Sequence, residues 1–292
     1  MKQDKSFTLK SKTLNKLKGL NVIIIGGTGG LGRAISRVLA FAGASVTVVG
    51  RSFRDQENSN IKFIKADLSS IKDSKRIAQN LDVSATDILL FTTGIFAGPK
   101  RELTEEGLES DMAVSFLNRL AILKEVAPRM GSEVNFLGFR PRVFVMAYPG
   151  SDQLGNIEDL NSEKSYSSMK THMNTVAGNE ALVYDSVSKY PNLRFYGLNP
   201  GLVKTNIRDN LFGKGSWKSS IMETMIGWFT NTPEQYANII TPLLVAPELD
   251  SYNGCNFNNK AQAIFPSKDF TKAYAAKYIS ASEKLLKDKK LD

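Results

Sequence analysis

Apolar residues follow two periods along the chain, one typical of strands and one typical of helices. Residues 21–26 form an apolar, β-branched run that breaks into glycines. Residues 31–42 follow with apolar side chains at helical spacing, and Gly43 ends that pattern. The pattern predicts a strand, a glycine turn and a helix in that order.

The same alternation continues through the rest of the chain. Further strands are predicted at 45–50, 61–66, 87–93, 142–147 and 194–198, and long helices at 104–130, 165–189 and 232–246. The last helix opens with Thr232, Pro233 and Glu234, which is typical of an N-cap, an N1 proline and an acid in the first turn. Strands that alternate with helices predict an α/β fold, in which a doubly wound parallel sheet is covered by helices on both faces.

A chain of 292 residues accommodates this as one domain. We expect a basic tail at 1–19, the α/β domain at 20–265 and a C-terminal helix at 266–292. The tail carries six lysines against Asp4. We interpret it as a solvated leader, with a lipid or RNA anchor as the alternative. Bulky apolar residues at about 205–230 indicate a lid over a cleft or, equally, an ordinary amphipathic helix.

Composition excludes several classes of protein. With 42% hydrophobic and 23% charged residues, the chain is typical of a soluble globular protein. One cysteine, Cys255, and one histidine, His172, exclude an internal disulfide, Cys-rich or His-rich metal sites and a Ser-His-Asp triad. We find no apolar stretch typical of a membrane helix or a signal peptide. We therefore expect a cytoplasmic protein without a metal, a nucleic-acid partner or a membrane partner.

The glycine-rich segment after the first predicted strand is typical of a phosphate-binding turn. Missing side chains let the backbone approach a pyrophosphate, and the following helix supplies N–H donors. Three spacings fit the segment: Gly27-x-Gly29-x-x-Gly32, Gly26-x-x-Gly29-x-x-Gly32 and Gly26-x-x-x-Gly30-x-Gly32. The segment therefore predicts a dinucleotide site but leaves its template open.

The end of the second predicted strand bears on the choice of dinucleotide. An acid there would bind the ribose 2′-hydroxyl of NAD, yet no carboxylate precedes Asp55, and Arg51 stands in this place. A guanidinium suits a 2′-phosphate, so NADP(H) is favoured. NAD(H) remains the alternative if Arg51 is only a surface arginine.

Tyr166 and Lys170 stand four residues apart at the start of the predicted helix at 165–189. This spacing places the phenol and the ammonium on one helix face. A neighbouring cation lowers the pKa of a phenol, so Tyr166 could donate a proton to a carbonyl oxygen. Taken alone, the pair is usually only part of a helix face.

Five motifs in order make the pattern more specific. The chain resembles the short-chain dehydrogenase/reductase superfamily over about residues 20–260, and in parts its fungal oxidoreductases. The motifs that carry the resemblance are Gly26-x-x-x-Gly30-x-Gly32, Asp67-Leu68, Thr93-Gly94, the pair Tyr166 and Lys170, and Asn199-Pro200-Gly201-Leu202-Val203-Lys204-Thr205.

The resemblance implies reduction of an aldehyde or ketone by hydride transfer from NADP(H). Tyr166 would protonate the oxygen, and Lys170 would bind the nicotinamide ribose and tune Tyr166. The substrate would be a small carbonyl or alcohol, and the family habit suggests a homo-oligomer. The implied cofactor contacts are Gly26, Thr28, Gly30, Leu31, Gly32, Arg51, Asp67, Leu68, Thr93, Gly94, Tyr166, Lys170, Pro200, Gly201, Val203 and Thr205.

The chain departs from the family pattern at two places. The catalytic serine has no aligned counterpart; Ser151 is our first choice and Tyr148, at the strand end, our second. The family's helical asparagine corresponds to Ser115, and its N-N-A-G element reads Phe-Thr-Thr-Gly at residues 91–94. These departures motivate an alternative, a dinucleotide-binding sensor or scaffold with weak or no catalysis.

Two further interpretations complete the sequence-based expectations. Sugar-nucleotide epimerase chemistry would use the second glycine spacing, but the chain is short for the substrate domain this implies. His172 lies about 200° around the helix from Lys170, so we expect it to pack internally or at a subunit contact.

Overall fold

The computed structural model describes residues 1–14, 16–201 and 231–292. The strands of these residues form one sheet in the order β3-β2-β1-β4-β5-β6-β7-β8. All neighbouring strands pair in parallel except β7 and β8, which are antiparallel. The bounds are β1 Asn21–Ile25, β2 Ser45–Gly50, β3 Ile61–Lys65, β4 Ile88–Phe91, β5 Arg142–Met146, β6 Arg194–Leu198, β7 Asn256–Phe257 and β8 Ala263–Ile264.

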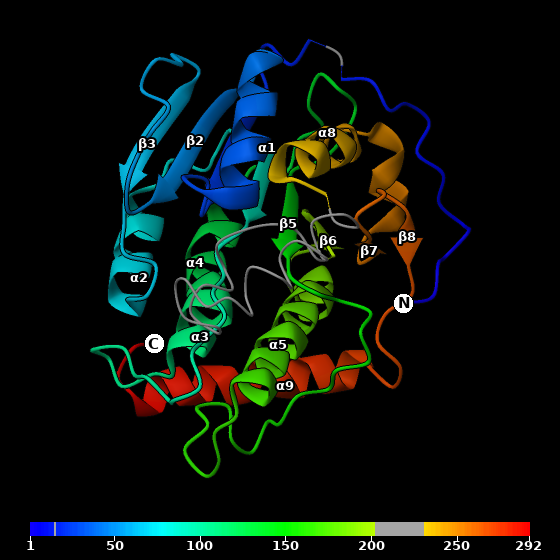
Figure 1. Ribbon diagram of the computed structural model, residues 1–292. Helices are drawn as coiled ribbons and strands as arrows, with labels where there is room; N and C mark the ends of the chain where they lie inside the picture. The colour runs from blue at the N-terminus through cyan, green and yellow to red at the C-terminus, as the bar shows by residue number, and fades with distance from the viewer. Residues whose placement is uncertain (15, 202–230) are drawn as a thin grey trace, which may run out of the picture.

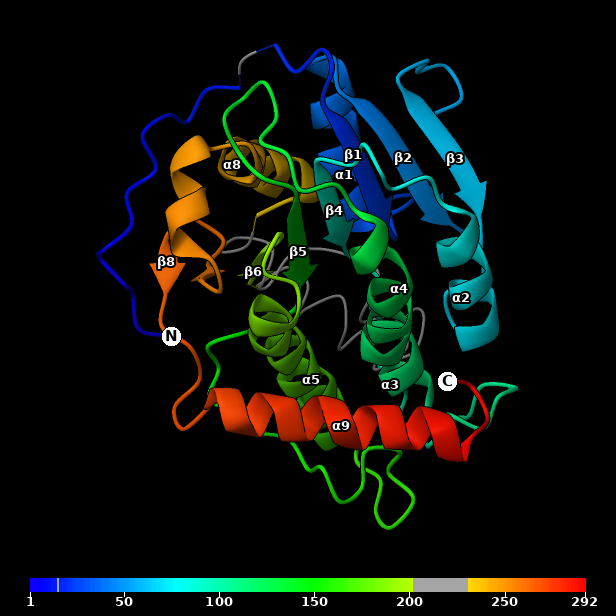
Figure 2. The same ribbon diagram turned by 180° about the vertical axis from the view of Figure 1, so that it is seen from behind.

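Helices cover both faces of the sheet, as the sequence predicts for a doubly wound fold (Figure 1). One face carries α1 (Gly30–Phe41) and α8 (Pro233–Leu244). The other carries α2 (Ile71–Asn80), α4 (Asn118–Val126) and α5 (Ser168–Lys189), with α9 (Lys272–Asp288) lying across α5 (Figure 2). The shorter elements are α3 (Ser110–Met112), a π-helical turn (Ala113–Leu117) and 3₁₀ turns at Ala127–Arg129 and Pro247–Tyr252.

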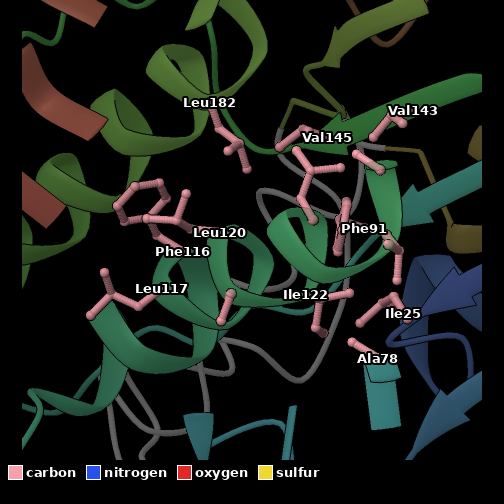
Figure 3. Packing of buried hydrophobic residues seen from close by; sticks show 14 of the residues in the cluster. Ile25, Ala78, Phe91, Phe116, Leu117, Leu120, Ile122, Val143, Val145 and Leu182 are labelled. Carbon is pink, nitrogen blue, oxygen red and sulfur yellow. The ribbon is translucent and has the colours of Figure 1, made fainter. Parts of the chain in front are cut away.

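Successive residues of each strand point to opposite faces, and both faces are buried. In β1, Val22 and Ile24 pack toward α1 and α8, whereas Ile23 and Ile25 pack toward α2 and α4. Figure 3 shows this second layer, where side chains of the α4 region meet those of β4 and β5. Burial on both sides explains why the strands are continuous apolar runs in the sequence.

The helix predicted at 104–130 begins later, at Ser110. Gly107 adopts a φ of +75° in a turn that precedes the helix. Glu106 accepts hydrogen bonds from the backbone N–H groups of Ile71 (2.7 Å) and Lys72 (3.0 Å), at the start of α2. A residue with a positive φ cannot lie within a right-handed helix, so the helix begins after Gly107. At α8, by contrast, the predicted N-cap Thr232 is confirmed.

The six lysines of the N-terminal segment are exposed, as expected for a solvated leader, but part of the segment packs against the domain. Gln3 bridges to Ile264 along the outer side of β8. Phe7 is buried, and its ring packs edge to face against Tyr252 and Phe257 with centroid distances of 5.0 and 5.1 Å. The segment covers the edge strand β8, whose two residues are too short for sequence periodicity to reveal.

The C-terminal helix α9 packs against α5. Tyr278 of α9 is fully buried, and its hydroxyl donates to the carbonyl oxygen of Asn174 in α5 (2.7 Å). The proposed lid at about 205–230 lies outside the described residues. None of the described helices has the length and apolar character needed to cross a bilayer.

Candidate active site

The helix α5 begins at Ser168, three residues later than predicted, so Tyr166 lies outside it. Ser167 is the N-cap, with an extended φ of −148°. Before it, the Asp159 carboxylate accepts hydrogen bonds from the backbone N–H groups of residues 163–165. This carboxylate holds the preceding chain in a turn, which prevents the helix from starting earlier.

Because Tyr166 is not helical, the expected Tyr166–Lys170 helix face is absent from the described conformation. The Tyr166 hydroxyl donates instead to the carbonyl oxygen of Gly98 (2.7 Å), and Lys170 is exposed. Burial, together with the charges of Glu109 and Asp111, raises the pKa of Tyr166 to about 12. The expectation that a neighbouring lysine lowers this pKa is wrong for this conformation, since burial and acids dominate.

The glycine turn packs tightly against the ends of β2 and β4. Gly26 has a φ of +91°, and a Cβ there would lie 2.7 Å from the Thr93 nitrogen. A Cβ on Gly32 would lie 2.5 Å from the carbonyl oxygen of Gly26, and Gly30 has a φ of +48°. Each glycine of the Gly26, Gly30, Gly32 spacing therefore has a local structural reason. Thr28 completes the turn with its side chain against Gly50.

Gly29 differs from these three glycines, because no heavy atom lies within 4 Å of a Cβ built at its position. Gly29 is also the N-cap of α1, and it has no side chain that could accept a hydrogen bond from the first-turn N–H groups. The first-turn N–H groups of α1 therefore face an open approach, which is the environment that a pyrophosphate occupies in dinucleotide sites. The residues present fit a dinucleotide at this position.

Arg51, which follows β2, and Asp67, which follows β3, are exposed. Arg51 is exposed, while Asp55 is buried and bound by Arg33. The Asp67 carboxylate accepts hydrogen bonds from the hydroxyl (2.7 Å) and the backbone N–H (3.0 Å) of Ser69, and these bonds lower the pKa of Asp67. The neighbouring Leu68 is buried. An exposed cation, Arg51, and a fixed carboxylate, Asp67, thus lie where the adenosine side of a dinucleotide is expected.

A cavity of about 370 Å³ opens at the carboxyl ends of β4, β5 and β6. Five of the predicted cofactor residues line it: Leu31, Thr93, Gly94, Pro200 and Gly201. The opposite wall comes from α5 and from the segments after β4 and β5, through Ile95, Phe96, Tyr148, Met169, His172, Met173 and Val176. Open α/β sheets bind ligands at this edge, so the cavity is the candidate active site.

The predicted catalytic residues are not on the wall of this cavity. Tyr166 and Lys170 do not line it, and neither does Ser151, whose hydroxyl donates to the Tyr148 carbonyl oxygen (2.8 Å). Of the two candidates for the strand-end position, only Tyr148 lines the cavity. The predicted contacts Val203 and Thr205 lie outside the described residues.

His172, which we expected to pack internally or at a subunit contact, lies on the cavity wall. Its Nδ1 atom is 2.8 Å from Oδ2 of Asp111, a fully buried carboxylate. The side chains of His172 and Lys170 lie on different sides of α5, as the helical spacing predicts. The side that meets the cavity is the one with His172. The spacing of Met169, His172, Met173 and Val176 along α5 could have revealed this face, because residues three and four apart share one side of a helix.

Arg119 forms the buried floor of the cavity. Its guanidinium donates to the carbonyl oxygens of Met146 (2.7 Å) and Thr93 and to the side-chain oxygen of Asn179 (2.8 Å). Burial lowers the pKa of Arg119 to about 9, and the charge of Asp111 opposes this change. One side chain thus links the ends of β4 and β5 to α5 and fixes the cavity walls.

Across residues 1–14, 16–201 and 231–292, no group of three or more His, Cys, Asp or Glu side chains is arranged to hold a metal ion.

Comparison with known proteins gives consistent results. A family model described as short chain dehydrogenase matches residues 20–135. An uncharacterized oxidoreductase of Saccharomyces cerevisiae is 47% identical over 291 residues, covering 98% of this chain and 94% of that protein. Among solved structures, an uncharacterized protein from Mycobacterium paratuberculosis superposes with a TM-score of 0.63 at 20% identity, covering 94% of this chain and 96% of that one. A short chain dehydrogenase from Salmonella enterica gives a TM-score of 0.61 at 15% identity, over 85% of this chain and 98% of that one.

Proposed function

Because this chain belongs to the short-chain dehydrogenase/reductase family, we propose that it is an NADP(H)-dependent oxidoreductase that reduces an apolar aldehyde or ketone to an alcohol. The observation that carries the proposal is the cavity, which joins predicted cofactor residues to an apolar wall. A carbonyl bound against that wall would lie next to the dinucleotide.

The lining of the cavity supports an apolar substrate of small to medium size. Phe96, Met146, Met169, Met173 and Val176 supply most of the wall opposite the glycine turn. Methionine side chains adapt to the shape of an apolar ligand, and a volume of about 370 Å³ accommodates a medium-chain aldehyde or ketone.

The chain supplies the groups that would hold the dinucleotide. The N-terminus of α1 would bind the pyrophosphate, and Arg51 would bind a 2′-phosphate. Thr93, Gly94 and Gly201 would contact the nicotinamide side, together with Val203 and Thr205 as the family resemblance implies. When bound, NADPH supplies the hydride.

The family resemblance assigns the proton to Tyr166. In the described conformation the Tyr166 hydroxyl is bound to the Gly98 carbonyl, so it would have to break this bond to reach a substrate oxygen. Lys170 would then need to approach from the exposed side of α5. Ser151 or Tyr148 would orient the carbonyl, and Tyr148 has the better position because it lines the cavity.

The test is consumption of NADPH and NADH with a panel of aliphatic and aromatic aldehydes and ketones. We expect carbonyl-dependent oxidation of NADPH, with faster turnover of apolar than of charged carbonyls. Binding of NADPH without turnover of any carbonyl would favour the dinucleotide sensor. The single cysteine suits a reducing compartment, so we expect the activity in the cytoplasm.

A further inference from the structure

The hydroxyl of Tyr166 is held away from the cavity by a backbone carbonyl. It donates to the carbonyl oxygen of Gly98 (2.7 Å), in the segment that follows β4. Tyr166 does not line the cavity in this arrangement. Burial and the charges of Glu109 and Asp111 raise its pKa to about 12, and so weak an acid is a poor proton donor near neutral pH. The described conformation therefore withholds the proton donor that the family resemblance implies.

The present start of α5 is weakly fixed. Ser167 is its N-cap, with an extended φ of −148°, and makes no side-chain capping hydrogen bond. The backbone N–H groups of Met169 and Lys170 lie in the first turn, where a helix offers them no intrahelical acceptor. A helix that began two residues earlier would give both groups such an acceptor, at the carbonyl oxygens of Ser165 and Tyr166.

The turn before α5 permits this longer helix. The Asp159 carboxylate accepts hydrogen bonds from three successive backbone N–H groups, the last of which belongs to Ser165. An N-cap residue contributes its carbonyl and side-chain oxygens to a helix, so its own N–H can stay bound elsewhere. Ser165 can therefore cap α5 without losing its bond to Asp159. The turn sets the earliest start of α5 at this residue, and Tyr166 would be the first helical residue.

Two further residues of helix would bring Tyr166 to the cavity. Met169 and Met173 line the cavity, and they stand three and seven residues after Tyr166. Residues at these spacings share one side of a helix, so a helical Tyr166 lies on the side that meets the cavity. Lys170, which is exposed in the described conformation, would then be its neighbour four residues later. The catalytic pair that the resemblance implies forms in the longer helix.

We propose that the contact with Gly98 is autoinhibitory, and that dinucleotide binding releases Tyr166 by extending α5 to an N-cap at Ser165. This inference rests on the proposed function. The resemblance implies that Tyr166 and Lys170 both contact the dinucleotide, which the longer helix allows and the described one does not. A ligand shifts a protein toward the state that it binds better, so the dinucleotide stabilises the longer helix. Tyr166 reaches the cavity only after the dinucleotide has bound.

Hydrogen exchange at the Met169 and Lys170 amides reports the length of α5 and needs no carbonyl substrate. Mass spectrometry at single-residue resolution measures it in the full-length protein with and without NADPH, and a fluorescence titration shows that NADPH is bound. The same samples are assayed for NADPH oxidation with the panel of carbonyls. Three variants are compared with the wild type: Tyr166→Phe, Ser168→Pro and Ser168→Ala.

Ser168→Pro is designed to keep α5 at its described start. Ser168 is the first helical residue, where proline is favoured, and Ser167 before it already has an extended φ of −148° and ψ of 124°. A residue that precedes proline avoids the helical region, so Ser167 is kept out of a longer helix. Ser168→Ala removes the same hydroxyl without this restriction and is the matched control. Urea unfolding of both variants checks that they are folded.

We expect NADPH to slow exchange at both amides about 10-fold or more in the wild type, because each gains an intrahelical hydrogen bond. Tyr166→Phe lacks the hydroxyl that binds Gly98, so without NADPH it should exchange about threefold more slowly than wild type. Ser168→Pro should keep the fast exchange when NADPH is bound and lose about 100-fold in kcat, the lower range for general acid catalysis. Ser168→Ala should resemble the wild type in both measurements.

The outcomes separate this inference from the proposed function. Exchange that bound NADPH leaves unchanged in the wild type, or a folded Ser168→Pro variant with the wild-type kcat, overturns the inference while the proposed function stands. Equal exchange in wild type and Tyr166→Phe without NADPH shows that the Gly98 contact holds nothing back. If exchange slows with NADPH but no carbonyl is reduced, the release of Tyr166 is supported and the proposed function fails. Absence of NADPH binding contradicts both.

Discussion

The guanidinium of Arg33 binds the carboxylate of Asp55 through two hydrogen bonds, from Nε to Oδ2 (2.8 Å) and from a terminal nitrogen to Oδ1 (2.6 Å). Asp55 is the first carboxylate after β2, and this pairing leaves it buried. It is therefore not available to a ribose 2′-hydroxyl. Arg51, exposed at the end of β2, is the nearer charged group for a ligand.

Arg51 should determine the preference for NADPH over NADH. We expect Arg51→Ala to weaken NADPH binding about 10-fold relative to NADH, because a charge-assisted hydrogen bond to phosphate contributes about 1.5 kcal/mol or more. Arg54→Ala removes an exposed arginine three residues away and should leave the ratio of the two affinities unchanged. Titration of both variants with each dinucleotide measures this ratio, and an unchanged ratio in Arg51→Ala would show that Arg51 is only a surface arginine.

Two glycines of the turn should respond differently to alanine. Gly32→Ala places a Cβ 2.4 Å from the Thr92 hydroxyl oxygen and 2.5 Å from a backbone oxygen, so we expect a loss of about 2 kcal/mol or more in the free energy of unfolding. Gly29→Ala meets no atom within 4 Å and should change this free energy by less than about 1 kcal/mol. It should nevertheless weaken dinucleotide binding about 10-fold, because its methyl group obstructs the N-terminus of α1. Urea unfolding and cofactor titration separate the two effects; tight binding by Gly29→Ala would place the pyrophosphate elsewhere.

Glu109 should make stability depend on pH. Burial raises the pKa of Glu109 from 4.5 to about 7, so the folded protein keeps a proton that the unfolded chain releases. This contribution is fully present below pH 4.5 and is lost as pH rises through about 7. Glu109→Gln retains the oxygen that accepts from the Met112 N–H and removes the titration. We expect its stability to fall about 3 kcal/mol less than that of wild type between pH 4.5 and 7.5, measured by urea unfolding; parallel curves would contradict the raised pKa.

The N-terminal segment should contribute to stability through Phe7. Removing a ring that packs against Tyr252 and Phe257 leaves a cavity, so Phe7→Ala should cost about 3 kcal/mol of unfolding free energy. Phe41 is 94% exposed, and Phe41→Ala should change this free energy by less than about 0.5 kcal/mol. Equal midpoints in guanidinium unfolding for the two variants would show that the segment does not pack as described.

Much of the fold is determined by local sequence patterns and can therefore be predicted from the sequence. The predicted strands at 45–50 and 194–198 match β2 and β6, and the other four differ by one or two residues at their ends. The capping residues of α8 and the position of the glycine turn are also confirmed. These features depend on periodicity and on backbone chemistry within a few residues, which the sequence displays directly.

The cavity at the carboxyl ends of the strands depends on contacts between distant parts of the chain. Asp111 and His172 are 61 residues apart and pair only because α3 packs against α5. The Asp159 turn precedes α5, which begins only at Ser168, and Tyr166 therefore lies outside this helix.

The sequence by itself determined the order of the elements, the glycine turn and the family, because these follow from local patterns and motif order. Only the tertiary structure decided that the cavity faces His172 instead of Lys170, and that Phe7 is buried. Packing sets these outcomes, since burial and hydrogen bonding across the fold select among the faces that local periodicity leaves equivalent.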